Sequence, residues 1–162
     1  MDEMTLRDAG RQVLLDGLAA AGVDAEPIGG DRWMAMLSGE WKRTIPLLLD
    51  LGDRWLTITS LFSGVLDEGH AEVYRVVLHR NQRSGPVHFA LDDEGHLVLV
   101  GGLPLAGMDA RAFDELLGSL LTVADETFNQ VLRAGFATYL EAEQRWRAKM
   151  GMPPNPVGDP SH

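Results

Sequence analysis

Histidines are the side chains of this sequence with the widest potential for catalysis or metal binding, and there are five of them. His88 and His96 flank one expected hairpin, where they either point to opposite faces or lie about 13 Å apart on one face. His70 and His79 are nine residues apart on one expected helix and have no third ligand at a helical or hairpin offset. The spacing predicts surface or hydrogen-bonded histidines and no metal site.

Acidic residues raise two further possibilities for chemistry. The run Asp92-Asp93-Glu94 is too short for calcium, which needs alternating ligands over a loop of about twelve residues. Asp125 lies beside Ala124 and Phe128 on the apolar side of an expected helix, where a carboxylate needs a hydrogen-bond donor. A structural hydrogen bond is the favoured interpretation of Asp125. The alternative is a pocket between the sheet and the last helix, which would make the protein a small-molecule sensor or an enzyme.

Motifs that would support enzyme activity do not occur in the sequence. No Ser, His and Asp spacing resembles a nucleophile elbow, and the pairs Gly29-Gly30 and Gly101-Gly102 lack the rest of a phosphate-binding fingerprint. The chain has no cysteine, which excludes disulfides, thiolate catalysis and thiolate-bound zinc. We therefore expect a non-enzymatic protein without catalytic residues, metal or cofactor.

Charge and length limit the possible partners. The formal net charge is −10, from 24 acidic and 14 basic residues, and it repels a phosphate backbone, so nucleic acid is not expected as a partner. No apolar run approaches the roughly 20 residues that cross a bilayer, and the start MDEMTLRDAG does not have the form of a secretory signal. We expect a cytoplasmic protein with one domain over residues 1–150. The proline-rich tail, 151–162, is expected to be disordered.

The periodicity of apolar residues predicts the order helix, three strands, helix, two strands, long helix. Thr5 and Asp8 have the form of a capping box, which starts the first helix, and Asp109 can cap the last one, with a break expected at Gly135. The expected strands are 32–38, 41–51, 54–62, 87–91 and 96–101, and the middle helix is 70–81.

Two strands carry more specific predictions. Pro46 has no amide hydrogen for a ladder, so we expect a bulge or an unpaired position around it. The run Leu97-Val98-Leu99-Val100 does not alternate, which is typical of a strand covered on both faces and predicts a place near the sheet centre.

The first strand offers the candidate site for a peptide or protein partner. Its Met34 and Met36 repeat on one face, and Trp33 and Trp41 flank the adjoining turn. Methionine and tryptophan suit adaptable interfaces, and a strand near a sheet edge can accept an extended peptide. The alternative is that the N-terminal helix of the same molecule covers these residues.

The middle helix has an apolar surface too wide for one contact. Val73 with Val77, and Tyr74 with Leu78, lie one turn apart. One side of the helix can rest on the sheet while the other meets a second copy of the chain, so these four residues are the candidate interface of a homodimer. Burial within the monomer is the alternative.

A set of landmarks along the chain resembles the YbjN-domain family: Leu78, Asn81, Phe89, Asp92-Asp93, Gly95, Leu97, Leu103-Pro104 and Ala124-Asp125. That family is similar in element order and size to the type III secretion chaperones, the CesT-like group. The resemblance covers roughly residues 6–134. It implies an α+β fold with a twisted five-stranded antiparallel sheet, homodimers, and chaperone-like or regulatory binding of peptide or protein segments. It assigns no functional residue.

Overall fold

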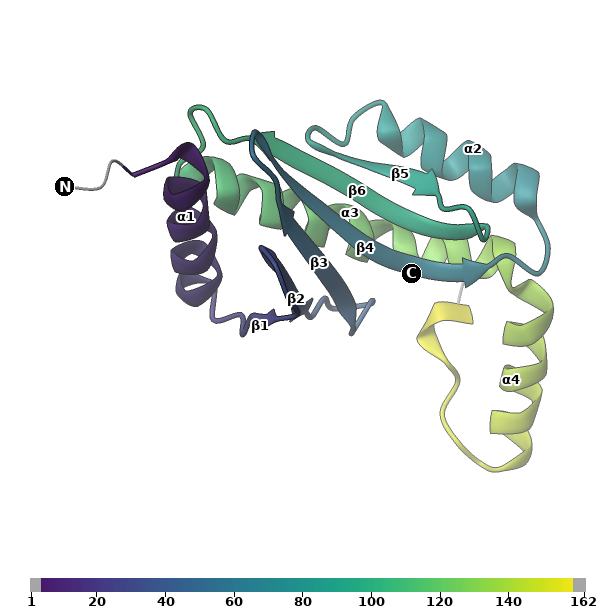
Figure 1. Cartoon of the computed structure of the whole chain (residues 1–162). Coiled ribbons are helices and arrows are strands. Elements are labelled where there is room, and N and C mark those ends of the chain that lie inside the picture. The colour runs from purple at the N-terminus through teal and green to yellow at the C-terminus, as the bar shows by residue number, and fades with distance from the viewer. Residues whose placement is uncertain (1–3, 159–162) are drawn as a thin grey trace.

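A sheet of six antiparallel strands forms one layer of the protein, and helices α1 and α3 cover one of its faces (Figure 1). The computed structural model describes residues 4–158. The α-helices span α1 Leu6–Ala20, α2 His70–Asn81, α3 Ala110–Gly135 and α4 Ala137–Lys149, and the 3-10 helix η1 spans Pro156–Gly158. The strands span β1 Glu26–Pro27, β2 Arg32–Leu37, β3 Ile45–Leu51, β4 Trp55–Val65, β5 Val87–Leu91 and β6 His96–Pro104, in the spatial order β1-β2-β3-β4-β6-β5.

The hydrophobic core lies between the sheet and these two helices. Alternate residues of β3 and β4, such as Leu49 and Ile58, are fully buried on the helix side, as are Leu14 of α1 and Phe113 of α3. Each such side chain contributes about 1.5–3 kcal/mol when it leaves water. The apolar residues that recur every second position in the strands and every 3.6 positions in the helices therefore meet in one core between the sheet and the helices.

The predicted fold class and element order are confirmed. The capping box of Thr5 and Asp8 starts α1, and the Asp109 side chain accepts a hydrogen bond from the Ala112 amide at the start of α3. The structure adds β1, a two-residue strand that pairs with β2, so the sheet has six strands instead of the expected five.

Strand β6 differs from the expectation that it lies near the sheet centre. It has a neighbour on each side, but β5 beyond it is already the edge. Leu97 and Leu99 are buried on the helix side, whereas Val98 is only 8% exposed on the opposite face, between its cross-strand neighbours Leu61 and Ala90. The side chains of the neighbouring strands cover Val98, so the non-alternating pattern does not require a second layer of helices.

The ladder around Pro46 agrees with the predicted unpaired position. The Leu51 amide donates to the Asp31 carbonyl on the β2 side, so by alternation position 46 faces β4. The ladder between β3 and β4 starts only at the pair of Leu48 and Thr59. Pro46 therefore faces a place where β3 and β4 have already separated, and no ladder bond is lost there.

A break separates α3 from α4 at the glycine where the sequence predicts one. The Gly135 carbonyl accepts hydrogen bonds from the Asp67 and Glu68 amides, each at 3.2 Å. The Glu68 carboxylate accepts one from the Thr138 amide at 2.7 Å, which lowers the pKa of Glu68. The loop between β4 and α2 thus binds to both sides of the break and sets the direction of α4.

The tail was expected to be disordered over residues 151–162, and its first eight residues instead follow a defined path. From Gly151 to Gly158 the chain folds back along α4 and forms η1, which contacts α3 and α4 (Figure 1). Hydrogen bonds to side chains of α4 hold this segment, so it needs little apolar surface of its own. Residues 159–162 of the expected tail lie outside the described residues.

Candidate functional site

The face of the sheet opposite α1 and α3 carries large apolar side chains in contact with solvent. Met36, Trp55 and Leu61 are 54%, 57% and 48% exposed, and Met34 and Val65 are also exposed. No helix lies over this face in Figure 1. A continuous apolar patch on a protein surface commonly marks an interaction site.

The strand register joins these residues into rows across the sheet. Met34 of β2 pairs with Leu48 of β3, which pairs with Thr59 of β4, and Thr59 pairs with Val100 of β6. Because neighbouring strands lie about 4.8 Å apart, this row is roughly 14 Å long. A second row runs from Leu61 through Val98 to Ala90. We call the face formed by these rows, with Met36 and Trp55, the open sheet face.

The four residues predicted to bind a partner are divided between the two sides of the sheet. Met34 and Met36 lie on the open sheet face and are exposed, as a binding surface requires. Trp33 points the other way and belongs to the hydrophobic core, and Trp41 is partly buried in the loop between β2 and β3. The alternative, that the N-terminal helix of the same molecule covers these residues, therefore does not hold for the two methionines. Trp33, in contrast, is buried.

Sequence reasoning did not select Trp55 and Leu61 as candidate site residues. Both faces of β4 read as a β-branched and aromatic mixture, so the sequence of this strand does not show which face is free. The register supplies that information, because it places Leu61 in the same row as Val98 and aligns Trp55 with Pro104 at the other end of the ladder.

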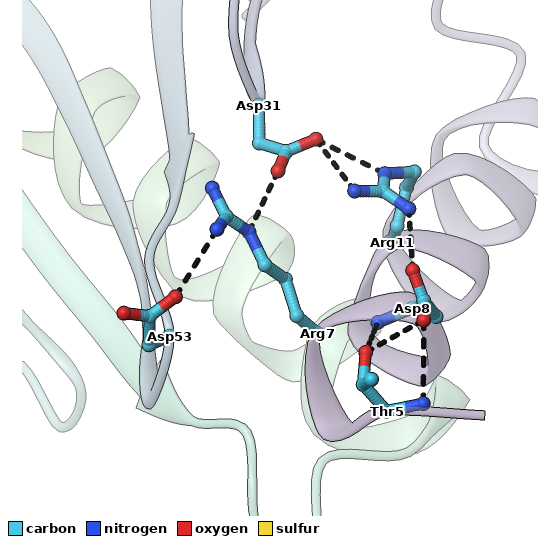
Figure 2. Close-up of polar contacts among 6 residues, drawn as sticks. All are labelled: Thr5, Arg7, Asp8, Arg11, Asp31 and Asp53. Carbon is cyan, nitrogen blue, oxygen red and sulfur yellow. Dashed lines mark hydrogen bonds and ion pairs between the residues drawn. The ribbon is translucent and has the colours of Figure 1, made fainter. Parts of the chain in front are cut away.

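A network of charges fixes α1 to the start of β2 (Figure 2). Arg11 donates to Asp31 Oδ1 through Nε at 3.1 Å and Nη2 at 2.7 Å, and Arg7 Nε lies 2.6 Å from Asp31 Oδ2. Arg7 also reaches Asp53 in the turn between β3 and β4, at 3.1 Å. The Arg11 hydrogen bonds hold the pKa of Asp31 below its usual value. This network positions β2, the strand that carries Met34 and Met36.

Asp125 makes a structural contact of the kind that the sequence favours. Its Oδ1 accepts hydrogen bonds from the Trp41 amide at 2.8 Å and the Lys42 amide at 2.9 Å. Since these amides bind α3 and not β2, β3 begins at Ile45, four residues later than expected. The link holds the loop between β2 and β3 on α3.

The Lys42 side chain is buried beside this link. Its Nζ donates to the Thr44 carbonyl at 2.9 Å and lies 5.2 Å from the centre of the Phe128 ring and 5.8 Å from that of Phe62. Burial lowers the pKa of Lys42. The two ring faces offset part of the cost of removing the ammonium from water.

The four candidate dimer residues on α2 also face in different directions. Val73 and Val77 are buried in the core of their own chain, Tyr74 is partly buried, and Leu78 is 66% exposed. A groove of about 320 Å³ between α2 and β5 is lined by Tyr74 and Leu78 together with Leu91. Of the four, Tyr74 and Leu78 are the more exposed residues at this groove, and the buried Val77 also lines it.

Asn81, at the end of α2, closes part of the outer edge of β5. Its Oδ1 accepts a hydrogen bond from the Phe89 amide at 2.7 Å, and its Nδ2 donates to the Phe89 carbonyl at 3.2 Å. The side-chain amide thus takes the place of a neighbouring strand at Phe89, and a partner strand cannot pair there. At the other edge, β1 pairs with only two residues of β2, Trp33 and Met34.

Neither a metal-binding cluster nor a membrane-spanning helix occurs in the described part of the chain. Between residues 4 and 158 there is no group of three or more His, Asp or Glu side chains placed to hold a metal ion. No helix in the same range combines the length and apolarity needed to span a membrane.

Relatives of this chain occur among mycobacterial proteins. "Uncharacterized protein Mb0497" of Mycobacterium bovis is 36% identical over 115 residues, which cover 71% of this chain and 63% of the relative. "Uncharacterized protein ML2442" of Mycobacterium leprae is 33% identical over 125 residues, covering 77% of this chain and 68% of the relative. The match thus spans less than two thirds of the length of the first relative.

Solved structures of protein complexes share the fold. The "ExsC-ExsE Complex" gives a TM-score of 0.57 at 21% identity and covers 79% of this chain and 97% of the matched one. The complex of ExoU and SpcU "from the type III secretion system (T3SS) of Pseudomonas aeruginosa" gives 0.51 at 19% identity, covering 74% and 94%. The complex of the Yersinia pestis "type III secretion chaperone SycH" with a fragment of YscM2 gives 0.50 at 18% identity, covering 71% and 96%.

The profile of one protein family matches most of the chain. It is that of YbjN, described as "Putative bacterial sensory transduction regulator", and it covers residues 11–133. This range runs from within α1 to the last turn of α3 and includes the whole sheet and Asn81, Phe89 and Asp125. The chain belongs to the YbjN family.

Proposed function

We propose that this protein is a non-enzymatic module that binds a protein or peptide segment, as a chaperone-like protein or a regulatory adaptor in the cytoplasm. The observation that carries the proposal is the open sheet face, where Met34 and Met36 of β2 and Trp55 and Leu61 of β4 are exposed on the same side of the sheet, with β3 between the two strands. Leaving these side chains in water has a cost of about 25 cal/mol for each Å² of apolar surface, which a bound partner would remove.

The fold comparisons support the same kind of function. The solved structures that share the fold include a chaperone with a bound protein fragment and two further complexes of two different proteins. Their sequences are 18–21% identical to this chain, so the shared property is the fold.

The geometry suits an extended segment that lies along β2. Residues 35–37 of β2 have no strand on their outer side within the described structure, because β1 begins only at Glu26, opposite Met34. A segment added at this edge would satisfy backbone groups of residues 35–37 and place alternate side chains beside Met36 on the open sheet face, where Met34 is also exposed. Flexible methionine side chains can adapt to different partner residues.

A charge on the open sheet face is expected to abolish this binding. In the double variant Met36→Lys with Leu61→Lys, the partner would have to bury two ammonium groups without counter-charges. We expect tagged wild-type protein to capture a small set of proteins from cell extract, and the double variant to recover them at a level lower by at least about tenfold. Quantitative mass spectrometry of the captured proteins measures the ratio.

The matched control places the same charges on apolar residues away from this face. Leu6 and Leu15 are exposed on α1, so the variant Leu6→Lys with Leu15→Lys has the same net charge as the test variant. The control should capture the wild-type set. Equal capture by all three proteins, or no specific capture by the wild type, would reject the open sheet face as the binding surface.

We also propose a homodimer through the groove between α2 and β5. Leu78 and Leu91 are 66% and 49% exposed at its rim, and the groove between them is mainly apolar. The wild type should elute at twice the 17.7 kDa chain mass in size-exclusion chromatography with light scattering, and Leu78→Asp at the monomer mass. Leu6→Asp on α1 is the control and should remain dimeric. A monomeric wild type would contradict the proposal.

A further inference from the structure

Helix α4 recognises the backbone and side chain of one residue of the tail. The Gln144 side chain is bidentate: its Nε2 donates to the Asn155 carbonyl and its Oε1 accepts from the Asn155 amide, both at 2.8 Å. Glu143 accepts from Asn155 Nδ2 at 2.9 Å, and Asn155 Oδ1 accepts from the Val157 amide at 3.0 Å. Every hydrogen-bonding group of Asn155 except one side-chain hydrogen is therefore used.

A third residue of α4 extends this recognition along the tail. Arg147 donates from Nη1 to the Pro153 carbonyl at 3.2 Å and from Nε to Glu143 at 3.0 Å. The Asn155 hydrogen bond and the Arg147 contact lower the pKa of Glu143, so its carboxylate stays charged as an acceptor. Glu143, Gln144 and Arg147 are the partly buried residues in an otherwise exposed stretch of α4, which shows that the tail covers them.

The sequence of the tail suits the hydrogen bonds that Glu143, Gln144 and Arg147 make. In Pro153-Pro154-Asn155-Pro156 only Asn155 has an amide hydrogen, and Gln144 accepts it. The prolines restrict the backbone before binding, so little conformational entropy is lost when the segment is held. A segment with asparagine between prolines is thus a stiff ligand. Its single amide hydrogen fixes which of its residues lies opposite Gln144.

An apolar groove continues from this contact toward the sheet. It has a volume of about 290 Å³, Asn155 forms part of its wall, and its other walls include Phe128 of α3 and Phe136 and Tyr139 at the start of α4. Phe62 at the end of β4 closes it. Aromatic grooves beside a hydrogen-bonding side chain are typical sites for proline-rich segments.

We propose that Glu143, Gln144 and Arg147, together with this groove, form a binding site for an extended segment that contains Pro-Asn-Pro, and that residues 153–157 of the same chain occupy it as a displaceable strap. A segment of the same chemistry from another protein binds there by displacing the strap. The hydrogen-bonding residues of the site lie on α4, beyond residues 11–133, and the site shares no residue with the open sheet face, so it does not depend on the function proposed for that face.

The test uses the full-length protein and a labelled synthetic peptide, Gly-Met-Pro-Pro-Asn-Pro-Val-Gly, which repeats residues 151–158. In the wild type the attached strap competes at a high effective concentration, so peptide binding should be weak. Asn155→Ala weakens the strap and leaves α4 intact, and it should bind the peptide at least about tenfold more tightly in fluorescence anisotropy. Adding Gln144→Ala to that variant should remove the gain.

Two controls separate recognition from general loosening of the tail. Gln130 is an exposed glutamine on α3, and Gln130→Ala in the Asn155→Ala background should leave peptide affinity unchanged. A peptide with alanine in place of its asparagine should not bind any variant. Equal peptide affinity with and without Gln144 would overturn the site, and so would the absence of binding to Asn155→Ala at millimolar peptide.

Discussion

Replacing Gly69 by alanine is expected to destabilise the protein by about 3–4 kcal/mol. The residue before α2 has φ +65°, a left-handed conformation that glycine adopts without strain. An added Cβ would also collide with the carbonyl oxygen of Ala134, in the last turn of α3. The backbone there cannot retreat easily, because the Gly135 carbonyl already holds the Asp67 and Glu68 amides. Urea unfolding of both proteins measures the loss.

Gly85 provides a matched control for this prediction. It has the same φ of +65°, but no atom beyond its two chain neighbours lies within 4 Å of the position that its Cβ would take. Gly85→Ala should therefore cost only the conformational strain, about 1 kcal/mol. The difference between the two variants isolates the contact between the loop and α3, and equal unfolding midpoints would show that the loop does not pack there as described.

Local signals in the sequence predicted the parts of the fold that local chemistry determines. The bounds of α2 agree with the expected range 70–81, because helix spacing begins directly after the Gly69 turn and ends where polar residues follow Asn81. The break expected at Gly135 is where α3 ends, and a side chain at this position would press on Leu66. Asp125 was expected to need a hydrogen-bond donor, and two backbone amides supply it.

Features that depend on distant residues could not be predicted. A wide apolar surface on α2 does not show that Val73 and Val77 turn toward their own core, since this depends on where α3 and β5 lie. The order of the tail depends on hydrogen bonds between Asn155 and α4, which leave no apolar pattern in the tail. The register of β4 with β6 determines which side chains of β4 lie on the open sheet face, and the sequence of β4 alone does not show this.

Asp125→Ala is expected to destabilise the protein by about 2–3 kcal/mol, because two backbone amides lose a carboxylate acceptor in a partly buried place. Besides lowering the stability of the whole protein, the substitution should loosen the loop between β2 and β3. Gly39 donates to the Lys42 carbonyl in the same loop, and its Cα lies against the Asp125 carboxylate with no room for a side chain. We expect the amides of Trp41 and Lys42 to exchange faster with solvent deuterium, as NMR can measure for each residue.

Two variants distinguish the hydrogen bonds from other effects of the substitution. Asp125→Asn keeps Oδ1 as an acceptor and should retain slow exchange at both amides, with a cost of about 1 kcal/mol or less, since the acceptor loses only its charge. Asp114→Ala removes an exposed carboxylate from the same helix, so it carries the same gain in helix propensity without the loop contact. Aspartate and asparagine both offer Oδ1 as an acceptor and differ in their charge. If Asp125→Asn were as unstable as Asp125→Ala, the charge of Asp125, and not its hydrogen bonds, would therefore hold the loop on α3.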